Sequence, residues 1–155
     1  MSEALKNYPS AGIFRRLAAM VYDSLLLMAI SIGYYAIAVG LNVLIQGQPP
    51  HGQKVEWGHS SWFVFSGWLV TMIGFYVFFW IKSGQTLGMR AWRMRLISES
   101  CRLTTGQCVL RCLAGIVSLL SFGLGYFWLL LDPKKQTLHD RVSKTLVIVL
   151  PKEQN

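Results

Sequence analysis

The sequence predicts an all-α membrane protein with two transmembrane helices and a third apolar segment. Of its 155 residues, 53% are hydrophobic and only 14% are charged, whereas about 25% of the residues in an ordinary soluble domain are charged. The mean hydropathy is +0.40, and three apolar stretches approach or exceed the roughly 20 residues that a helix needs to cross a bilayer. These observations favour a single small membrane domain, residues 1–155, in contact with the lipid bilayer.

The first two apolar stretches are expected to span the membrane. Residues 17–45 exceed the length of one span, so that the helix can tilt or carry an interfacial first turn. This stretch ends at QGQPPHGQ, residues 46–53, where prolines and glycines stop a helix. Residues 61–81 contain no charge, and Trp62 and Trp80 stand near the two ends, where aromatic side chains suit the membrane interfaces.

Basic residues report the orientation of the chain. The loop between the first two spans is nearly neutral, with Lys54 against Glu56, whereas residues 82–111 carry six basic residues against Glu99 alone. Because short cytoplasmic loops are enriched in lysine and arginine, we expect the N-terminus and the basic segment to be cytoplasmic. The net charge of +8 is then explained by orientation, and no nucleic-acid partner is expected.

The third apolar stretch, residues 112–131, allows two arrangements. A single straight helix would just span the bilayer, but it would leave a basic tail on the outer face, against the orientation rule. Alternatively, SFGLG at residues 121–125 breaks the stretch into two short helices that enter and leave on the cytoplasmic side. Such a break is tolerated at membrane depth only where protein covers the backbone. We prefer this re-entrant helical hairpin.

Two short segments are predicted to be strands. RMRLI, residues 93–97, alternates basic and apolar side chains, and TLVIVL, residues 145–150, is rich in β-branched residues. If both lie in the cytoplasm, they can pair as a two-stranded sheet. The alternative for residues 89–97 is an interfacial amphipathic helix with arginines at the headgroups. We find no internal repeat in the sequence.

Arg16 and Asp23 are the first candidate site residues. They are seven residues apart, which places both on one face of a helix at a separation of roughly 10 Å. A carboxylate at the centre of a membrane helix costs about 2.5 to 3.5 kcal/mol, so Asp23 needs a partner. We choose Arg111, which opens the third apolar stretch, because a guanidinium there can reach down and bind a carboxylate in a fork.

The tail motif DPKKQTLHD supplies three further candidates. Asp132 and Asp140 are its first and last residues. Asp132 precedes Pro133, so that a role in ending a helix is at least as good an explanation as a functional one. His139 beside Asp140 resembles a proton-handling pair, but neighbouring side chains point in different directions. We therefore favour a surface or headgroup-facing histidine.

Motifs of enzyme and metal chemistry are missing from the sequence. There is no phosphate-binding loop, no nucleophile elbow and no metalloprotease motif. The three cysteines, Cys101, Cys108 and Cys112, form no C-x-x-C pair and lie far from the histidines, so we interpret them as packing residues. We expect no enzyme, no cofactor and no metal site.

Four motifs, in order and rough spacing, resemble the RDD family of bacterial membrane proteins. They are AGIFRRLAAMVYDSLLL, SGQTLGMRAWRMRLIS, VLRCL and LDPKKQTLHDRVSKTLVIV, between Ala11 and Val149. The family is named for one arginine and two aspartates, and the resemblance assigns these to Arg16, Asp23 and Asp140. It implies a multi-pass protein of the bacterial inner (plasma) membrane, with transport or cation/proton exchange suggested for relatives. One departure is Met89, where relatives often carry a lysine before the arginine.

Two functions compete at this stage. In the first, the chain is a small transporter or cation/proton exchanger in which Asp23 accepts the ion and Arg16, Arg111 and Asp140 surround it. Because two spans and a hairpin enclose little space, such a pathway calls for a homo-oligomer, and the transported ligand is unknown. In the second, the chain is a structural or accessory membrane protein, and the same residues form an ionic lock between helices.

Overall fold

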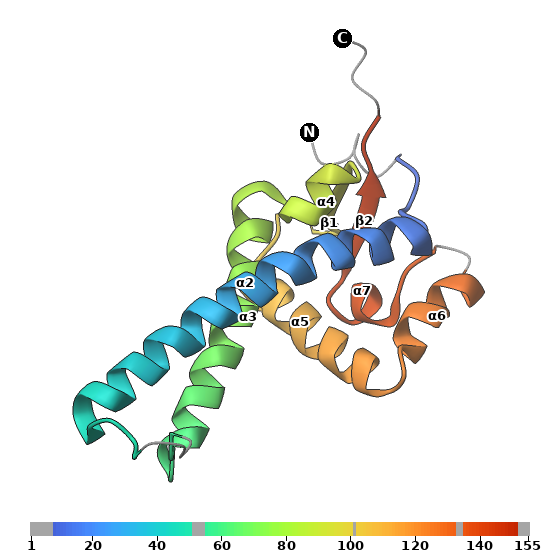
Figure 1. The fold of residues 1–155 in the computed structure, drawn as a ribbon. Helices are drawn as coiled ribbons and strands as arrows, with labels where there is room; N and C mark the ends of the chain where they lie inside the picture. Colours follow the sequence, from blue (N-terminus) through green and yellow to red (C-terminus); the bar gives the residue numbers. More distant parts are fainter. Residues whose placement is uncertain (1–7, 51–54, 101, 133–134, 152–155) are drawn as a thin grey trace. The chain divides into compact units, whose positions relative to one another are not determined.

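A computed structural model describes residues 8–50, 55–100, 102–132 and 135–151. The fold is mostly helical with one small sheet (Figure 1). Three residues that the sequence analysis names, Lys54, Cys101 and Pro133, lie outside the described residues. In chain order the elements are α2 (Ile13–Gln46), α3 (Ser60–Ser83), α4 (Leu87–Ala91), β1 (Met94–Ser98), α5 (Thr105–Leu120), α6 (Leu124–Leu131), α7 (Leu138–Val142) and β2 (Thr145–Val149).

The helices α2 and α3 are long and apolar enough to cross a membrane, as predicted. The helix α2 begins before residue 17, so that Arg16 lies inside its first turn. The third apolar stretch is broken, because α5 and α6 are bent by 99° at the predicted SFGLG break. There Phe122 and Gly123 have φ angles of 55° and 76°, in the left-handed region that ends a helix. A straight helix over residues 112–131 is therefore wrong, while the break itself is confirmed.

The chain divides into two compact units. The smaller unit, residues 24–72, consists of the later part of α2 and the earlier part of α3. Within it, the Trp68 indole donates a hydrogen bond to the Ser31 hydroxyl at 2.9 Å, and the Tyr34 hydroxyl donates to the Val64 carbonyl at 2.8 Å. Because polar groups within apolar helices need partners, these bonds tie the two helix segments together.

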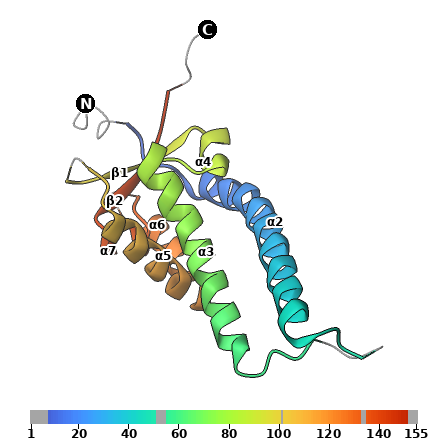
Figure 2. The same ribbon diagram turned by 90° about the vertical axis from the view of Figure 1, so that its left-hand side faces the viewer.

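The larger unit contains both strands and the shorter helices. The strands β1 and β2 pair antiparallel, which confirms the predicted sheet, and the amphipathic-helix alternative for residues 89–97 is wrong. The N-terminal segment extends this layer, because Ala11 donates to the Val147 carbonyl at 2.8 Å and Val149 donates to the Pro9 carbonyl at 2.9 Å. In Figure 2, α5, α6 and α7 lie together beside the sheet.

The hydrophobic core of this unit gathers on the strands. Its buried members come from the N-terminal segment, from both strands and from the helices α2 to α5: Ala11, Ala19, Trp80, Met89, Met94, Leu96, Cys108 and Val147. Cys108 is fully buried among them, and Cys112 packs against the same core. Ala11 near the start of the chain and Val147 near its end thus pack in the same core.

An internal repeat underlies the sheet, contrary to our expectation from the sequence. QTLGMRAWRMRLIS, residues 85–98, and QTLHDRVSKTLVIV, residues 136–149, share the opening QTL and two basic positions, Arg90 with Arg141 and Arg93 with Lys144. Each copy folds as a five-residue helix followed by a five-residue strand, α4–β1 in the first and α7–β2 in the second. The repeat is short and its copies are far apart in sequence, so that periodicity does not reveal it.

The two copies match in backbone detail. The N-cap residue of each helix is a threonine, Thr86 or Thr137, whose hydroxyl accepts the N–H three residues later. A basic residue with a left-handed backbone connects each helix to its strand: Arg93 at φ 54° and Lys144 at φ 52°. A non-glycine residue rarely adopts this conformation. The two connections between helix and strand therefore share the same backbone conformation at equivalent positions.

The copies are related by an approximate two-fold axis. In the antiparallel register, Leu96 in the centre of β1 lies opposite Val147 in the centre of β2. These two residues occupy equivalent positions in the repeat, so the axis passes through their pair. The helices α4 and α7 therefore precede opposite ends of the same two-stranded ribbon.

Candidate functional site

The first candidate site is built around Asp140 in the helix α7. Asp140 and the N-cap Thr137 form a capping box, in which each side chain accepts the backbone N–H of the other. The Thr137 N–H donates to Asp140 Oδ2 at 3.1 Å. Both residues are completely buried. The carboxylate of Asp140 is therefore fixed by its own short helix before any other element contacts it.

Arg16 reaches Asp140 from the first turn of α2. Its Nη1 donates to Asp140 Oδ2 at 2.6 Å, and its Nε donates to the Ala11 carbonyl at 2.9 Å. The side chain is only 5% exposed. Among the described residues, no partner faces its Nη2. The guanidinium thus joins the start of α2 to the C-terminal tail.

Arg111 reaches the other carboxylate oxygen from α5. Its Nη1 donates to Asp140 Oδ1 and to the Thr145 hydroxyl at 2.9 Å. Its guanidinium also lies over the Trp80 ring, at 5.3 Å from the centroid, where a cation is attracted to the aromatic face. We call Arg16, Asp140 and Arg111 the Arg–Asp–Arg cluster. It connects α2, α5, α7 and the start of β2.

The cluster keeps Asp140 ionised. Burial by itself would raise the pKa of Asp140, but attraction to Arg111 and Arg16 is stronger and holds that pKa well below its usual range. The neighbouring His139 responds in the opposite way. Burial, together with the positive charge of Arg111, lowers the pKa of His139 to about 3. At neutral pH the cluster is therefore a carboxylate between two guanidiniums, beside a neutral imidazole.

The second candidate site surrounds Asp23 and holds the first turn of α4. Asp23 Oδ2 accepts the Thr86 hydroxyl at 2.6 Å, and its Oδ1 accepts the Gly88 N–H at 2.9 Å. The Thr86 hydroxyl in turn accepts the Met89 N–H at 3.2 Å. A Cβ on Gly88 would collide with the Ala19 carbonyl oxygen and approach Asp23 Oδ1 to 2.9 Å. Only glycine allows this close approach.

The structure therefore separates Asp23 from the other predicted site residues. It brings Arg16, Arg111 and Asp140 together, but the predicted pairing of Arg111 with Asp23 is wrong. Arg111 is bonded to Asp140 and Thr145, and Arg16 turns back to Ala11 and Asp140. Asp23 is satisfied by a hydroxyl and a backbone N–H instead. Although they share a helix face, Arg16 and Asp23 belong to different sites.

The two secondary candidates have different outcomes. His139 is 4% exposed, so its assignment to the surface is wrong, and its ring packs on Tyr126 with 4.8 Å between centroids. Asp132 is the C-cap residue of α6, which confirms its role in ending a helix. Its Oδ2 accepts the Gln136 N–H at 3.0 Å. Across the part of the chain that the structure describes, no three His, Cys, Asp or Glu side chains gather closely enough to hold a metal ion.

Four site residues escaped sequence reasoning: Thr86, Gly88, Thr137 and Thr145. The repeated QTL sequence is the signal that points to the two N-cap threonines. In the second copy, the spacing T-x-x-D is a capping-box pattern that was available from the sequence. Gly88 contributes a backbone N–H, and such a donor carries no signature of its own.

Comparison with known proteins identifies the family. Residues 10–144 match the RDD family. The chain belongs to the RDD family. It is also similar to an uncharacterized protein of Rickettsia prowazekii (strain Madrid E), with 33% identity over 87 residues, which is 55% of this chain and 48% of the relative. The chain thus spans about half the length of that curated relative. No solved structure matches the chain.

In this RDD chain, the arginine and two aspartates assigned by resemblance are divided between two sites. Arg16 and Asp140 belong to the Arg–Asp–Arg cluster, and Asp23 belongs to the site at α4. Each aspartate binds the first turn of a repeat helix. Asp140 does so from within α7, whereas Asp23 does so for α4 from another helix.

Proposed function

We propose that the chain is a multi-pass protein of the bacterial inner membrane with a cytoplasmic N-terminus. In this topology α2 and α3 cross the bilayer, and α5 and α6 form a re-entrant hairpin. The pairing of β1 with β2 supports it, because these strands stand on either side of the hairpin in the sequence. A complete crossing by residues 112–131 would put the two strands on opposite faces of the membrane. The basic segment 82–111 supports a cytoplasmic location for all of them.

Reporter fusions test this topology. We expect a fluorescent protein fused after Asn155 to fold and emit, and alkaline phosphatase at the same point to be inactive, because the tail is cytoplasmic. As the matched control, phosphatase inserted after Gln48, in the loop between α2 and α3, should be active. Active phosphatase after Asn155 would contradict the re-entrant arrangement.

We propose further that this is a structural or accessory membrane protein in which the Arg–Asp–Arg cluster is an ionic lock. The observation that carries this proposal is that both oxygens of the Asp140 carboxylate accept hydrogen bonds within the protein. One oxygen accepts from Arg16 and from the Thr137 N–H, and the other accepts from Arg111. A carboxylate that is held ionised by two buried guanidiniums is poorly suited to take up and release protons. It is well suited to fix the tail against α2 and α5.

Proteolysis of the purified protein tests the lock. Arg141 and Lys144 are exposed trypsin sites next to the cluster. With Asp140→Asn, we expect cleavage at these sites to accelerate at least about ten-fold, because the tail is no longer held. Asp132→Asn is the matched control and should be cleaved at the rate of the wild type. Equal rates for Asp140→Asn and wild type would contradict the lock.

A second candidate function, proton or cation exchange, is favoured by one observation at Asp23. This carboxylate is buried in a helix that is long enough to span the membrane, and its hydrogen bonds among the described residues come from neutral groups. A carboxylate that has no counter-charge at such a position is a candidate ion acceptor. Because the spans enclose little space, this function would require a homo-oligomer.

Reconstituted liposomes distinguish the two functions. An exchanger predicts proton flux driven by a sodium or potassium gradient in the wild type, and loss of that flux in folded Asp23→Asn. The accessory function predicts no flux above that of empty liposomes. Size-exclusion chromatography of both proteins serves as the folding control and also reports the oligomeric state.

A further inference from the structure

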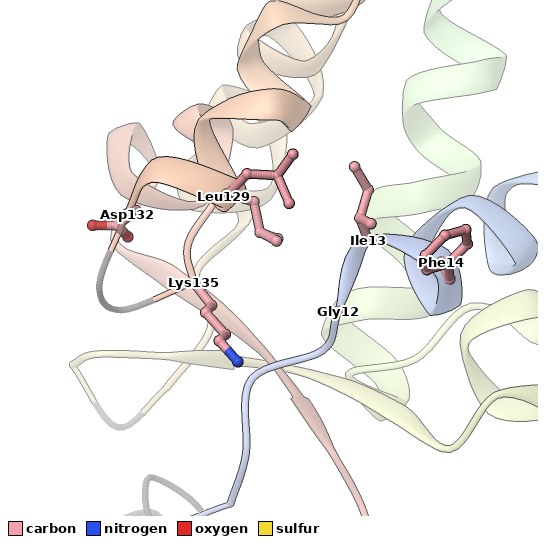
Figure 3. A pocket seen from close by; sticks show the side chains of 7 residues that line it. Gly12, Ile13, Phe14, Leu129, Asp132 and Lys135 are labelled. Atoms are coloured by element: carbon pink, nitrogen blue, oxygen red, sulfur yellow. The ribbon is translucent and has the colours of Figure 1, made fainter.

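An apolar groove of about 390 Å³ lies between the first turn of α2 and the end of α6 (Figure 3). Its walls are Ile13 and Phe14 on one side and Leu129 and Leu130 on the other, and Gly12 contributes only backbone. Figure 3 shows the Lys135 side chain extending toward the segment that carries Gly12, whereas Asp132 points away from the groove. The groove therefore combines apolar walls with one cation at its rim.

The groove opens onto a surface that suits lipid rather than water. Phe14 is 85% exposed and Leu130 is 65% exposed, and large apolar side chains seldom stand so far out in contiguous patches of soluble proteins. Both residues belong to helices that are candidate membrane segments. Lys135 and Arg15 mark the polar boundary beside them. A site with apolar walls and a basic rim at this boundary matches the two parts of a phospholipid.

We propose that this groove binds one anionic phospholipid. An acyl chain lies along Phe14 and Leu130, and the headgroup phosphate contacts the Lys135 ammonium. The inference rests on the proposed placement of the start of α2 at the membrane surface. Charge selects the anionic headgroup, because the side chain of Lys135 is exposed and forms no ion pair with any carboxylate among the described residues.

Hydrogen bonds on both sides hold the backbone of Lys135 in place. Its N–H donates to the Asp132 carbonyl at 2.9 Å, and its own carbonyl accepts the Ser10 hydroxyl at 2.8 Å. The residue has a left-handed backbone with φ 50°. Because the loop is tied to the N-terminal segment, the Lys135 backbone is held at the edge of the groove.

Lipid titrations followed by native mass spectrometry test the headgroup contact. The full chain in detergent is titrated with phosphatidylglycerol or phosphatidylcholine of identical acyl chains. A basic residue near an anionic surface contributes about 1 kcal/mol, so Lys135→Asn should weaken phosphatidylglycerol binding roughly five-fold. Lys144→Asn is the matched control, because Lys144 is also exposed and left-handed, with φ 52°. It should leave binding unchanged.

A second pair of variants tests the groove itself. A Cβ at Gly12 or at Gly106 meets no atom within 4 Å, so the first atom of a side chain is accommodated at either position. Gly12→Phe should fill the groove and remove one bound phosphatidylglycerol per chain, whereas Gly106→Phe should not. Both variants must elute as monodisperse protein, like the wild type.

Several results would overturn the inference. Equal losses with Lys135→Asn and Lys144→Asn would mean that general electrostatic attraction explains binding. Equal affinity for the two lipids would remove the role of the headgroup, and normal binding by Gly12→Phe would exclude the groove. The reporter fusions are independent of these results. A failed lipid site therefore leaves the proposed topology standing, and a failed topology is detected separately.

Discussion

The two buried aspartates are bound in opposite ways. Asp140 lies between the guanidiniums of Arg16 and Arg111, while Asp23 accepts hydrogen bonds from the Thr86 hydroxyl and the Gly88 backbone. Both bind the first turn of a five-residue helix in the repeat. The difference is that one carboxylate balances buried positive charge and the other completes a set of neutral hydrogen bonds. Their removal should therefore have unequal consequences.

The repeat explains why two carboxylates are present. Asp140 belongs to the second copy, and the equivalent position in the first copy is Met89. The first copy therefore lacks a carboxylate of its own, and Asp23 from α2 takes that place at the start of α4. Each short helix thus has a carboxylate at its N-terminus. For α7 the carboxylate is Asp140 of the same copy, and for α4 it is Asp23 of another helix, α2.

The largest expected effect follows from removing Asp140. Asp140→Leu leaves two buried guanidiniums without a counter-charge, which should lower the free energy of unfolding by about 3 to 5 kcal/mol. Thermal unfolding in detergent micelles measures the loss. Asp132→Leu, at the C-cap of α6, should cost much less. A loss below about 1 kcal/mol for Asp140→Leu would show that the cluster is not a lock.

Gly88→Ala tests the close approach of α4 to α2. The added Cβ collides with the Ala19 carbonyl oxygen, and such overpacking typically costs about 1 to 3 kcal/mol. Gly106→Ala is the matched control in an open position of α5, where alanine should be neutral or slightly stabilising. If the two variants unfold at the same temperature, α4 is not held against α2 as described.

Asp23→Asn should cost less than either change. The amide oxygen can still accept the Gly88 N–H, but the amide NH2 replaces the oxygen that accepts the Thr86 hydroxyl, so that this bond is lost, at about 1 to 2 kcal/mol. Thr86→Val removes the hydroxyl partner and should cost a similar amount. The double variant should then cost less than the two single losses together, because both remove the same bond. Fully additive losses would argue against the bond between Asp23 and Thr86.

The smallest effect is a pH dependence from His139. Because the folded pKa is about 3 and the unfolded value is about 6.5, the unfolded chain binds the extra proton first as the pH falls. Stability is therefore full well above pH 6.5 and declines as the pH falls through that value, by about 1.4 kcal/mol at pH 5.5. Asp140, whose folded pKa is lowered, adds a further loss only below about pH 4. His139→Gln should flatten the curve between pH 5.5 and 7.5, and an unchanged slope would contradict the buried neutral imidazole.

Long-range apolar and charge patterns could be read from the sequence, but local hydrogen bonds could not. The spans, the break at residues 121–125 and the two strands follow from hydropathy, glycine content and β-branched residues. The partner of Asp23 was misassigned because a charge suggests an opposite charge. The actual donors are the Thr86 hydroxyl and the Gly88 N–H, and every residue type except proline carries such an N–H. His139 is buried and its ring packs on Tyr126 of the preceding helix, a contact between helices that the hydropathy pattern does not predict.

The central claim is that Arg16, Asp140 and Arg111 act as one electrostatic unit that holds the tail. The most direct test compares Asp140→Leu with the triple variant Arg16→Met, Arg111→Met and Asp140→Leu by thermal unfolding in detergent. Replacing a complete buried ionic group by apolar residues is often neutral, whereas breaking it is costly. We therefore predict that the triple variant is more stable than Asp140→Leu alone. A triple variant that is less stable than the single one would contradict the claim.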